Sequence, residues 1–244
     1  MFQEAIDRYK SDNNIEQLHI TTALIDMDGV LYDSMPYHTI AWHRLATELG
    51  IKAERDEFYL YEGMTGAATI RKLINRAFGR TDVTDEECRQ LYAKKAQYFT
   101  EIATIKPVND AQRMTAILRD NDIERVLVTG SGQINLLNGL NVDYAGIFDQ
   151  DKRVTALDVK HGKPNPEPYL KGMQKVNRCA TQCMVIENAP LGVESGAKAG
   201  CFVIAITTGP IPVEKMKDAG AHLVFNSMTE FADALPLLLN LLKG

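Results

Sequence analysis

The chain has 244 residues, of which 45% are hydrophobic and 24% are charged. This composition is typical of a globular protein and excludes collagenous, coiled-coil and wholly disordered chains. The 27 basic and 32 acidic side chains give a formal net charge of -5, which argues against a surface for nucleic acid or anionic membranes. A small phosphate ligand stays compatible with this charge, because one lysine or metal ion reverses the field inside a cleft. The length fits one large domain or a smaller domain with an insert.

Neither a targeting segment nor a disulfide framework is predicted. Acidic residues interrupt the N-terminal stretch, so it does not resemble a secretory signal. The apolar stretch at residues 235–242 is far shorter than the roughly 20 residues of a membrane helix. We therefore expect a cytoplasmic protein, a monomer or weak oligomer, with neither nucleic acid nor membrane as partner. The cysteines form no CxxC pair and are expected to be buried free thiols: Cys88, Cys179, Cys183 and Cys201.

In chain order, a polar helix is expected at residues 3–17, followed by a buried strand at 21–25. Further apolar, β-branched runs predict strands at residues 125–129, 183–187, 202–207 and 222–225. Helical periodicity predicts helices at residues 109–121, 131–140, 166–177 and 190–199. Because strands and helices alternate, the predicted fold class is α/β with a parallel sheet.

The interval between the first and second strands has a different character. It contains helix-period segments at residues 37–49, 67–78 and 84–102 and no strand-like run. Thr84 and Glu87 form a capping-box pattern at the start of the third segment. We expect residues 34–106 to be an inserted helical domain and residues 1–33 and 107–244 to form the core domain. Pro36 and Pro107 mark the two crossings.

Polar residues follow three of the predicted strands, where open parallel sheets bind their ligands. Asp26 and Asp28 follow the first strand and point to one side of an extended chain, where two carboxylates repel unless a cation or a proton intervenes. Thr129-Gly130-Ser131 follows the second strand and offers hydroxyl and backbone donors to an anion. Glu187 and Asn188 follow a third strand with oxygen ligands of the kind that Mg²⁺ prefers. Lys163, before a predicted helix, supplies a cation.

These segments resemble, in order, the four motifs of the haloacid-dehalogenase superfamily, in the branch that contains β-phosphoglucomutase and related phosphatases. The matching segments are Asp26-Met27-Asp28-Gly29-Val30, Thr129-Gly130-Ser131, Gly162-Lys163-Pro164 and Glu187-Asn188-Ala189-Pro190-Leu191-Gly192-Val193. A lone DxDG also occurs in calcium loops, but Tyr32 and Asp33 do not continue that pattern. The resemblance covers nearly the whole chain and implies a Rossmann-like core with an inserted helical cap.

The resemblance also implies a mechanism. Asp26 would attack phosphorus to form an aspartyl-phosphate, and Asp28 would act as general acid and base. Thr129 would bind the transferred phosphoryl group, and Lys163 would neutralise charge beside Asp26. Mg²⁺ is the expected cofactor, with Asp26, Asp28, Glu187 and Asn188 as its expected ligands. The expected substrate-binding residues are Gly130, Ser131, His38 and Glu62.

This chain departs from the branch at two places. Relatives commonly carry a second acid where this chain has Asn188, which leaves the metal site one charge short. In β-phosphoglucomutases the loop corresponding to residues 61–66 carries a Lys and an Arg that hold the second phosphate of the sugar, but here Glu62 and Gly66 take those places. In a bacterial member of the branch that hydrolyses inorganic pyrophosphate, a cap glutamate reaches the metal. Glu62 is similar to that residue, although a surface glutamate near a helix is an equal alternative.

Several functions remain open at this point. Singly, each motif residue has an ordinary structural role as a turn former, helix cap or solvated side chain, but the set of four ordered motifs favours an enzyme. We expect a Mg²⁺-dependent phosphohydrolase that acts on pyrophosphate or another small phosphate. The alternative is a β-phosphoglucomutase with the same nucleophile. A dehalogenase, which needs no Mg²⁺, and a non-catalytic phosphate-binding regulatory protein fit the residues less well.

Overall fold

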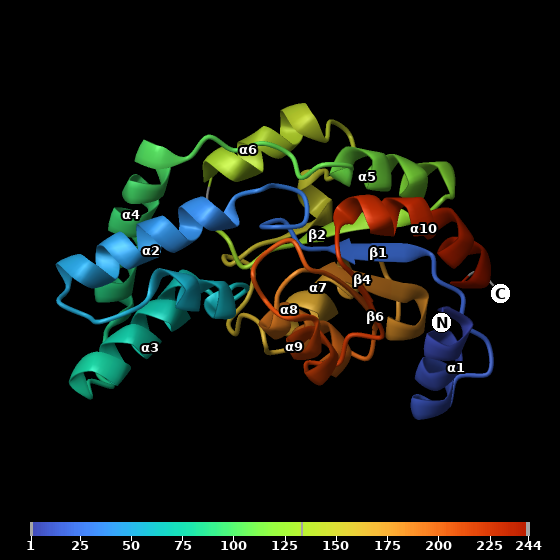
Figure 1. The fold of residues 1–244 in the computed structure, drawn as a ribbon, viewed down its shortest axis with the longest axis horizontal. Helices are drawn as coiled ribbons and strands as arrows, with labels where there is room; N and C mark the ends of the chain where they lie inside the picture. The colour runs from blue at the N-terminus through green and yellow to red at the C-terminus, as the bar shows by residue number, and fades with distance from the viewer. Residues whose placement is uncertain (1, 133, 243–244) are drawn as a thin grey trace.

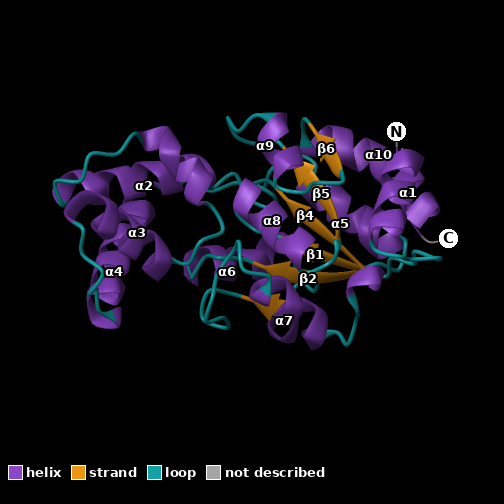
Figure 2. Ribbon diagram, turned by 90° about the horizontal axis from the view of Figure 1, so that it is seen from below, coloured by secondary structure: helices purple, strands orange, loops and turns teal. Residues whose placement is uncertain are grey.

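The computed structural model describes residues 2–132 and 134–242. Its centre is a parallel sheet of six strands in the order β3-β2-β1-β4-β5-β6 (Figure 2). This sheet confirms the predicted α/β class. The strand bounds are β1 Thr22–Ile25, β2 Glu124–Val128, β3 Arg153–Val154, β4 Cys183–Glu187, β5 Phe202–Ile206 and β6 Leu223–Phe225.

Helices cover both faces of the sheet because alternate strand residues point to opposite sides. Ile25 and Leu127 pack in one buried cluster with α1, α5, α6 and α10, while Leu24 and Val126 pack in a second cluster with α7, α8 and α9. These helices span α1 Phe2–Asp12, α5 Ala111–Asp120, α6 Ile134–Asp143, α7 Glu167–Lys175, α8 Pro190–Lys198, α9 Val213–Asp218 and α10 Met228–Leu242. The two apolar layers fix the strands, and with them the polar residues that follow each strand.

Between β1 and β2 lies a helical segment that Figure 1 draws beyond the arrowhead of β1. It comprises α2 Met35–Glu48, the 3₁₀ helix η1 Arg55–Tyr61, α3 Gly66–Phe78 and α4 Asp85–Ile102. The two crossings lie side by side, since the Asp33 N–H donates to the Lys106 carbonyl at 3.0 Å and Tyr32 pairs with Pro107. We call this segment the cap, and its division from the core at residues 34 and 106 remains our proposal.

The structure differs from the sequence-based expectation in several elements. Helix α1 ends at Asp12 rather than residue 17, and the predicted helix at 131–140 begins at Ile134 as α6; residue 133 lies outside the described residues. Strand β3 was not predicted, because two residues carry too little pattern. Helices α9 and α10 were also missed. Cys179 is exposed, whereas the other three cysteines are buried as expected.

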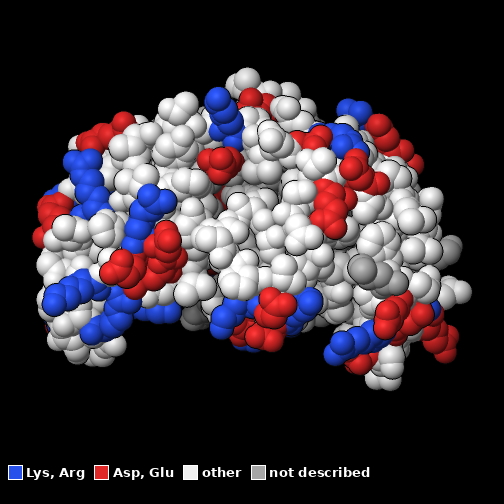
Figure 3. Space-filling model, in the orientation of Figure 1, with Lys and Arg blue, Asp and Glu red and all other residues white. Residues whose placement is uncertain are grey.

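The surface of the molecule is charged but carries both signs of charge. On the face drawn in Figure 3, basic and acidic side chains are interspersed among uncharged ones. Many of these charges form ion pairs, such as Arg44 with Glu101 at 2.7 Å within the cap. Over residues 2–132 and 134–242, no helix has both the length and the apolar character needed to cross a membrane.

Candidate active site

The loop after β1 brings two carboxylates below the cap. The Asp26 N–H donates to the Ile186 carbonyl at 3.0 Å, so the chain runs parallel to β4 up to the first carboxylate. The backbone then turns at Gly29, whose φ of +78° favours glycine. A Cβ at Gly29 would lie 1.9 Å from Nδ2 of Asn188. Glycine at this position therefore lets the loop after β1 touch the loop after β4.

Lys163 lies between two acids with its side chain fully buried. Its Nζ contacts Oδ1 of Asp26, and donates to Oε1 of Glu187 at 2.6 Å and to the Val128 carbonyl at 3.0 Å. Burial raises the pKa of Asp26 to about 8, although the charge of Lys163 opposes this effect. Burial by itself would lower the pKa of Lys163, but the charges of Asp26 and Glu187 outweigh it and raise that pKa. The lysine therefore stays charged beside Asp26, the carboxylate that we expect to act as the nucleophile.

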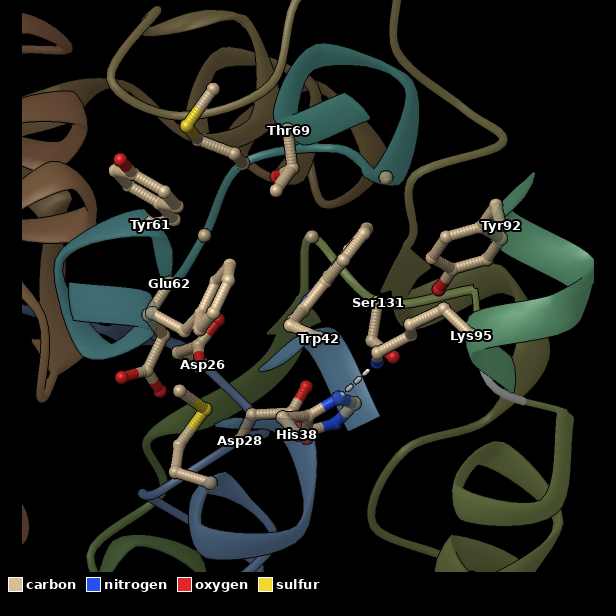
Figure 4. Close-up of a pocket in the computed structure, with 16 residues that line it drawn as sticks. Asp26, Asp28, His38, Trp42, Tyr61, Glu62, Thr69, Tyr92, Lys95 and Ser131 are labelled. Carbon is tan, nitrogen blue, oxygen red and sulfur yellow. Dashed lines mark hydrogen bonds and ion pairs between the residues drawn. The ribbon is translucent and has the colours of Figure 1, made fainter. Parts of the chain in front are cut away.

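Asp28 heads a chain of buried polar side chains that reaches into the cap. Its Oδ1 accepts from Ser34 Oγ at 2.5 Å and lies 3.0 Å from Nε2 of His38. On the other side of the ring, Nδ1 of His38 lies 2.5 Å from Nζ of Lys95, which reaches over from α4 (Figure 4). The arrangement suits a neutral imidazole with its proton on Nε2, so that Lys95 donates to Nδ1.

The pKa shifts agree with a neutral His38. Burial and the charge of Lys95 lower the pKa of His38. Burial lowers the pKa of Lys95 to about 7. Burial raises the pKa of Asp28, but the positive charge shared by the hydrogen-bonded His38 and Lys95 and the hydrogen bonds from His38 and Ser34 outweigh it and leave that pKa below the ordinary value. The sequence interpretation missed Lys95; its signal is a lysine on the same face of α4 as buried Tyr98 and Phe99.

The loop after β2 forms another wall of the site. The Ser131 N–H donates to Oγ1 of Thr129 at 3.0 Å, which closes a turn directly after β2. A Cβ at Gly130 would lie 2.5 Å from the Gly63 carbonyl oxygen in the cap. A bare backbone at Gly130 therefore lets the cap loop lie directly on the loop expected to bind phosphate.

Glu62 reaches the loop after β4 from the cap. Its Oε1 accepts from Nδ2 of Asn188 at 2.9 Å. Burial, followed by the charge of Asp26, raises the pKa of Glu62 well above its ordinary value. Glu62 Oε2 and Asn188 Oδ1 are buried and have no hydrogen-bond partner within the described structure. Two buried oxygens without a partner carry a large desolvation cost unless a ligand satisfies them.

These oxygens fit a hard divalent cation, which takes carboxylate and amide oxygens as ligands. Within the described ranges, no three His, Cys, Asp or Glu side chains by themselves form an arrangement that could hold a metal ion. A set of ligands that combines the carboxylates of Asp26 and Glu62 with the amide oxygen of Asn188 would suit a divalent cation instead. Asp28 and Glu187 already accept hydrogen bonds from protein donors, and their roles as ligands stay predictions.

The cap and the core line a partly open cavity with about 50 Å³ of space for water molecules. Lys95 is the one Lys or Arg among the described residues that line it, and it is engaged by His38. The lining also contains Asp26, Asp28, His38, Glu62, Gly130 and Ser131, all predicted from the sequence. The other four predicted residues are buried nearby and absent from the described lining: Thr129, Lys163, Glu187 and Asn188.

Tyr92 narrows the cavity on the cap side. A Cβ at Gly66 would lie 2.1 Å from Cδ2 of the Tyr92 ring, so the ring occupies the space that a side chain at position 66 would need. The hydroxyl of Tyr92 accepts from the Gly132 N–H at 3.4 Å and thereby joins α4 to the loop after β2. The sequence analysis gave no role to Tyr92, because its contact with Gly66 depends on how α3 packs against α4.

A parallel α/β sheet that presents a lysine-paired carboxylate beneath a helical cap defines a class of phosphoryl-transfer enzymes. The chain belongs to the haloacid dehalogenase-like hydrolase family, whose model matches residues 20–200. It is an enzyme of the phosphatase and phosphomutase type within that superfamily. The family and branch expected from the four motifs are thereby confirmed.

Named relatives include both hydrolases and mutases. Hexitol phosphatase A of Escherichia coli (strain K12) is 31% identical over 85% of this chain and 91% of its own length. Beta-phosphoglucomutase of Bacillus subtilis (strain 168) is 24% identical over 76% of this chain and 83% of its own. The solved structure of a Bacteroides vulgatus protein with the provisional name beta-phosphoglucomutase is 40% identical, with a TM-score of 0.95, and covers 100% of this chain and 98% of that one.

Proposed function

We propose that this protein is a Mg²⁺-dependent phosphohydrolase that works through an aspartyl-phosphate on Asp26 and acts on inorganic pyrophosphate or another phosphate with a small leaving group. The single observation that carries this proposal is the narrow, partly open pocket beside Tyr92, with about 50 Å³ of space for water molecules. A leaving group as large as a sugar phosphate would need the pocket to rearrange. Pyrophosphate leaves as a single phosphate, which is smaller.

The charge of the cavity supports the same choice. A sugar bisphosphate has a second phosphate that needs its own cation. In the part of the chain that the structure describes, Lys95 is the one Lys or Arg on the cavity wall, and it lies against His38. Glu62 would repel a second phosphate directly but would hold a divalent cation together with Asn188. This arrangement of charges favours a substrate that binds together with a divalent cation.

The reaction divides between two carboxylates. Asp26 attacks phosphorus while Lys163 neutralises charge on its carboxylate, and Thr129 and the backbone N–H groups of its loop hold the phosphoryl oxygens. Asp28 takes a proton from the water that then attacks the aspartyl-phosphate. Asp26, Asn188 and Glu62 would hold Mg²⁺, whose positive charge would stabilise the phosphoryl oxygens.

The low pKa of Asp28 also bears on the leaving group. His38 and Ser34 keep this carboxyl largely ionised, which suits a general base and makes it a weak general acid. A sugar oxygen leaves as a basic alkoxide and depends on a proton from the enzyme. A phosphate is a much weaker base and leaves with less help. The environment of Asp28 therefore favours an anhydride over an ester.

The second candidate is a β-phosphoglucomutase, because relatives with that name cover most of the chain. A substrate panel separates the two. With Mg²⁺, we expect pyrophosphate to be hydrolysed with a higher kcat/KM than hexitol phosphates or β-glucose 1-phosphate, and we expect EDTA and Asp26→Asn each to abolish phosphate release. Faster interconversion of β-glucose 1-phosphate and glucose 6-phosphate than hydrolysis of either would favour the mutase instead.

A further inference from the structure

The carboxylate of Glu187 is held by four donors from the protein. Its Oε1 accepts from Nζ of Lys163 at 2.6 Å and from the hydroxyl of Tyr169 at 2.7 Å. Its Oε2 accepts from the N–H groups of Asn188 at 3.0 Å and Ala189 at 3.4 Å. Both oxygens are therefore directed by the fold, and Tyr169 is the one neutral side chain among the described donors.

The packing leaves this carboxylate little freedom to move. A Cβ at Gly192, in the first turn of α8, would lie 1.8 Å from Oε1 of Glu187. Tyr169, in the first turn of α7, has no solvent exposure. The face of its ring lies 5.1 Å from Nζ of Lys163, within the range of a cation–π interaction. Tyr169 thus acts on Lys163 twice, through its ring and through Glu187.

The charges explain why a neutral donor is needed here. One ammonium, Lys163, lies between two carboxylates, Asp26 and Glu187. If Lys163 alone satisfied Oε1 of Glu187, the stronger pairing would draw the ammonium away from the nucleophile. The Tyr169 hydroxyl stabilises part of the charge on Glu187 without adding a charge of its own. Burial raises the pKa of Tyr169 well above its ordinary value, so the hydroxyl keeps the proton that it donates.

We propose that Tyr169 is a positioning residue that keeps Lys163 shared between Glu187 and the nucleophile Asp26. This inference rests on the proposed phosphohydrolase function and adds a residue to it that the motifs do not contain. Tyr169 has no solvent exposure and its hydroxyl donates to Oε1 of Glu187, so we place it behind Lys163 and Glu187 rather than against the substrate. Its effect therefore falls on the chemical step and leaves binding of the leaving group unchanged.

The test is Tyr169→Phe, which keeps the ring and removes one donor. We expect kcat for pyrophosphate to fall by roughly 10- to 100-fold, the size of a lost hydrogen bond to a charged group, with KM within about twofold. The matched control is Tyr9→Phe, because the Tyr9 hydroxyl also donates one bond of 2.7 Å, to the Gly200 carbonyl, and its ring is equally buried. The control should keep wild-type kcat while losing a similar amount of stability in urea.

A double-mutant cycle links the effect to its partner. In a Glu187→Gln background, Tyr169→Phe should change kcat by less than about twofold, since the charge that the hydroxyl stabilises is gone. Crystal structures give a readout that needs no activity: in Tyr169→Phe, Nζ of Lys163 should lie closer to Glu187 and farther from Asp26 than in the wild type.

Distinct outcomes overturn the inference and the function. Unchanged kcat in Tyr169→Phe, an equal loss in Tyr9→Phe, a rise in KM alone, or additive effects in the cycle would each refute positioning by Tyr169. Absence of phosphate release from the wild type on every substrate of the panel would refute the phosphohydrolase, while the position of Lys163 in the variant crystal would still decide the inference.

Discussion

At the scale of single residues, the main feature of the site is that buried carboxylates are compensated by nearby lysines and hydrogen-bond donors. Asp26, Asp28, Glu62 and Glu187 are all buried within one region, and Lys163 and Lys95 are the buried lysines that face them. Because burial disfavours ionised groups, each carboxylate depends on a particular partner. Glu62 has the weakest support, since one oxygen contacts an amide and the other contacts no polar group within the described residues. We therefore choose Glu62 for the first substitution.

Replacing Glu62 by Ala removes the carboxylate that we propose completes the metal site when the cap is closed. We expect kcat/KM for pyrophosphate to fall by roughly 10- to 1000-fold, about 1.4 to 4 kcal/mol of transition-state stabilisation, with a smaller loss for larger phosphate esters. Isothermal titration of Mg²⁺ into the variant should also show weaker binding. The control is Glu54→Ala, an exposed acid at the start of η1 with no side-chain capping bond. Unchanged pyrophosphate turnover in Glu62→Ala would contradict this role.

At the scale of elements, the sequence is most informative where a pattern is local. The apolar, β-branched runs predict five of the six strands because a short continuous apolar run between polar residues is typical of a strand that is buried on both faces. The capping box at Thr84 is also confirmed: the Glu87 N–H donates to Oγ1 of Thr84, and the Thr84 N–H donates to Oε2 of Glu87. Both interactions join residues three apart, so neighbours in sequence suffice to predict them.

Elements and contacts that depend on residues far apart in the chain are not predicted by local sequence patterns. Helix α10 contains Pro236, which removes a backbone donor and disfavours a helix interior by about 3 kcal/mol. The helix forms because its leucines, among them Leu235, Leu238 and Leu239, are fully buried in the core. Lys95 is a similar case in the site. Its proximity to His38 requires α2 and α4 to pack together across a sequence separation of 57 positions, and residue type alone does not reveal this contact.

The capping box gives a test of cap stability. In Thr84→Ala, the Glu87 N–H loses its acceptor at the start of α4, and the free energy of unfolding should fall by about 0.5–2 kcal/mol. Urea unfolding followed by circular dichroism measures this change. Thr81→Ala, in the exposed loop before the box, should leave the urea midpoint unchanged. Equal urea midpoints in the two variants would mean that packing, rather than the capping bond, stabilises α4. This helix also carries Lys95 of the site.

At the scale of the whole molecule, α1 is attached to the edge of the core by aromatic contacts. The Tyr9 ring packs edge-on against His222 at 4.9 Å and against Phe202 at 5.3 Å. Nδ1 of His222 accepts from the Val203 N–H at 2.9 Å, which requires the ring to be unprotonated on that nitrogen. Burial lowers the pKa of His222 from 6.5 to about 4. The attachment of α1 thus depends on a neutral histidine.

This histidine makes stability depend on pH with a definite sign. Between pH 4 and 6.5 the unfolded chain binds a proton at His222 that the folded chain does not, so folding stability from this residue is full above about pH 6.5 and is lost progressively as the pH falls to about 4. The expected loss is about 3 kcal/mol. Urea midpoints measured from pH 4 to 7.5 should fall less steeply in His222→Gln than in the wild type, while exposed His161→Gln should follow the wild-type curve. Parallel curves for wild type and His222→Gln would disprove the effect.

The adjacent crossings of the cap have a consequence for how such enzymes diversify. The outgoing chain at Asp33 and the returning chain at Lys106 are joined by a backbone hydrogen bond of 3.0 Å, so the insertion opens and closes at nearly one point of the core. Any helical segment with equally close ends can replace this one without changing the order of the strands. Evolution can therefore exchange the cap, which we propose selects the leaving group, while it conserves the core, which we propose cleaves the phosphorus–oxygen bond. A chimera with a relative's cap is a route to altered specificity in the laboratory.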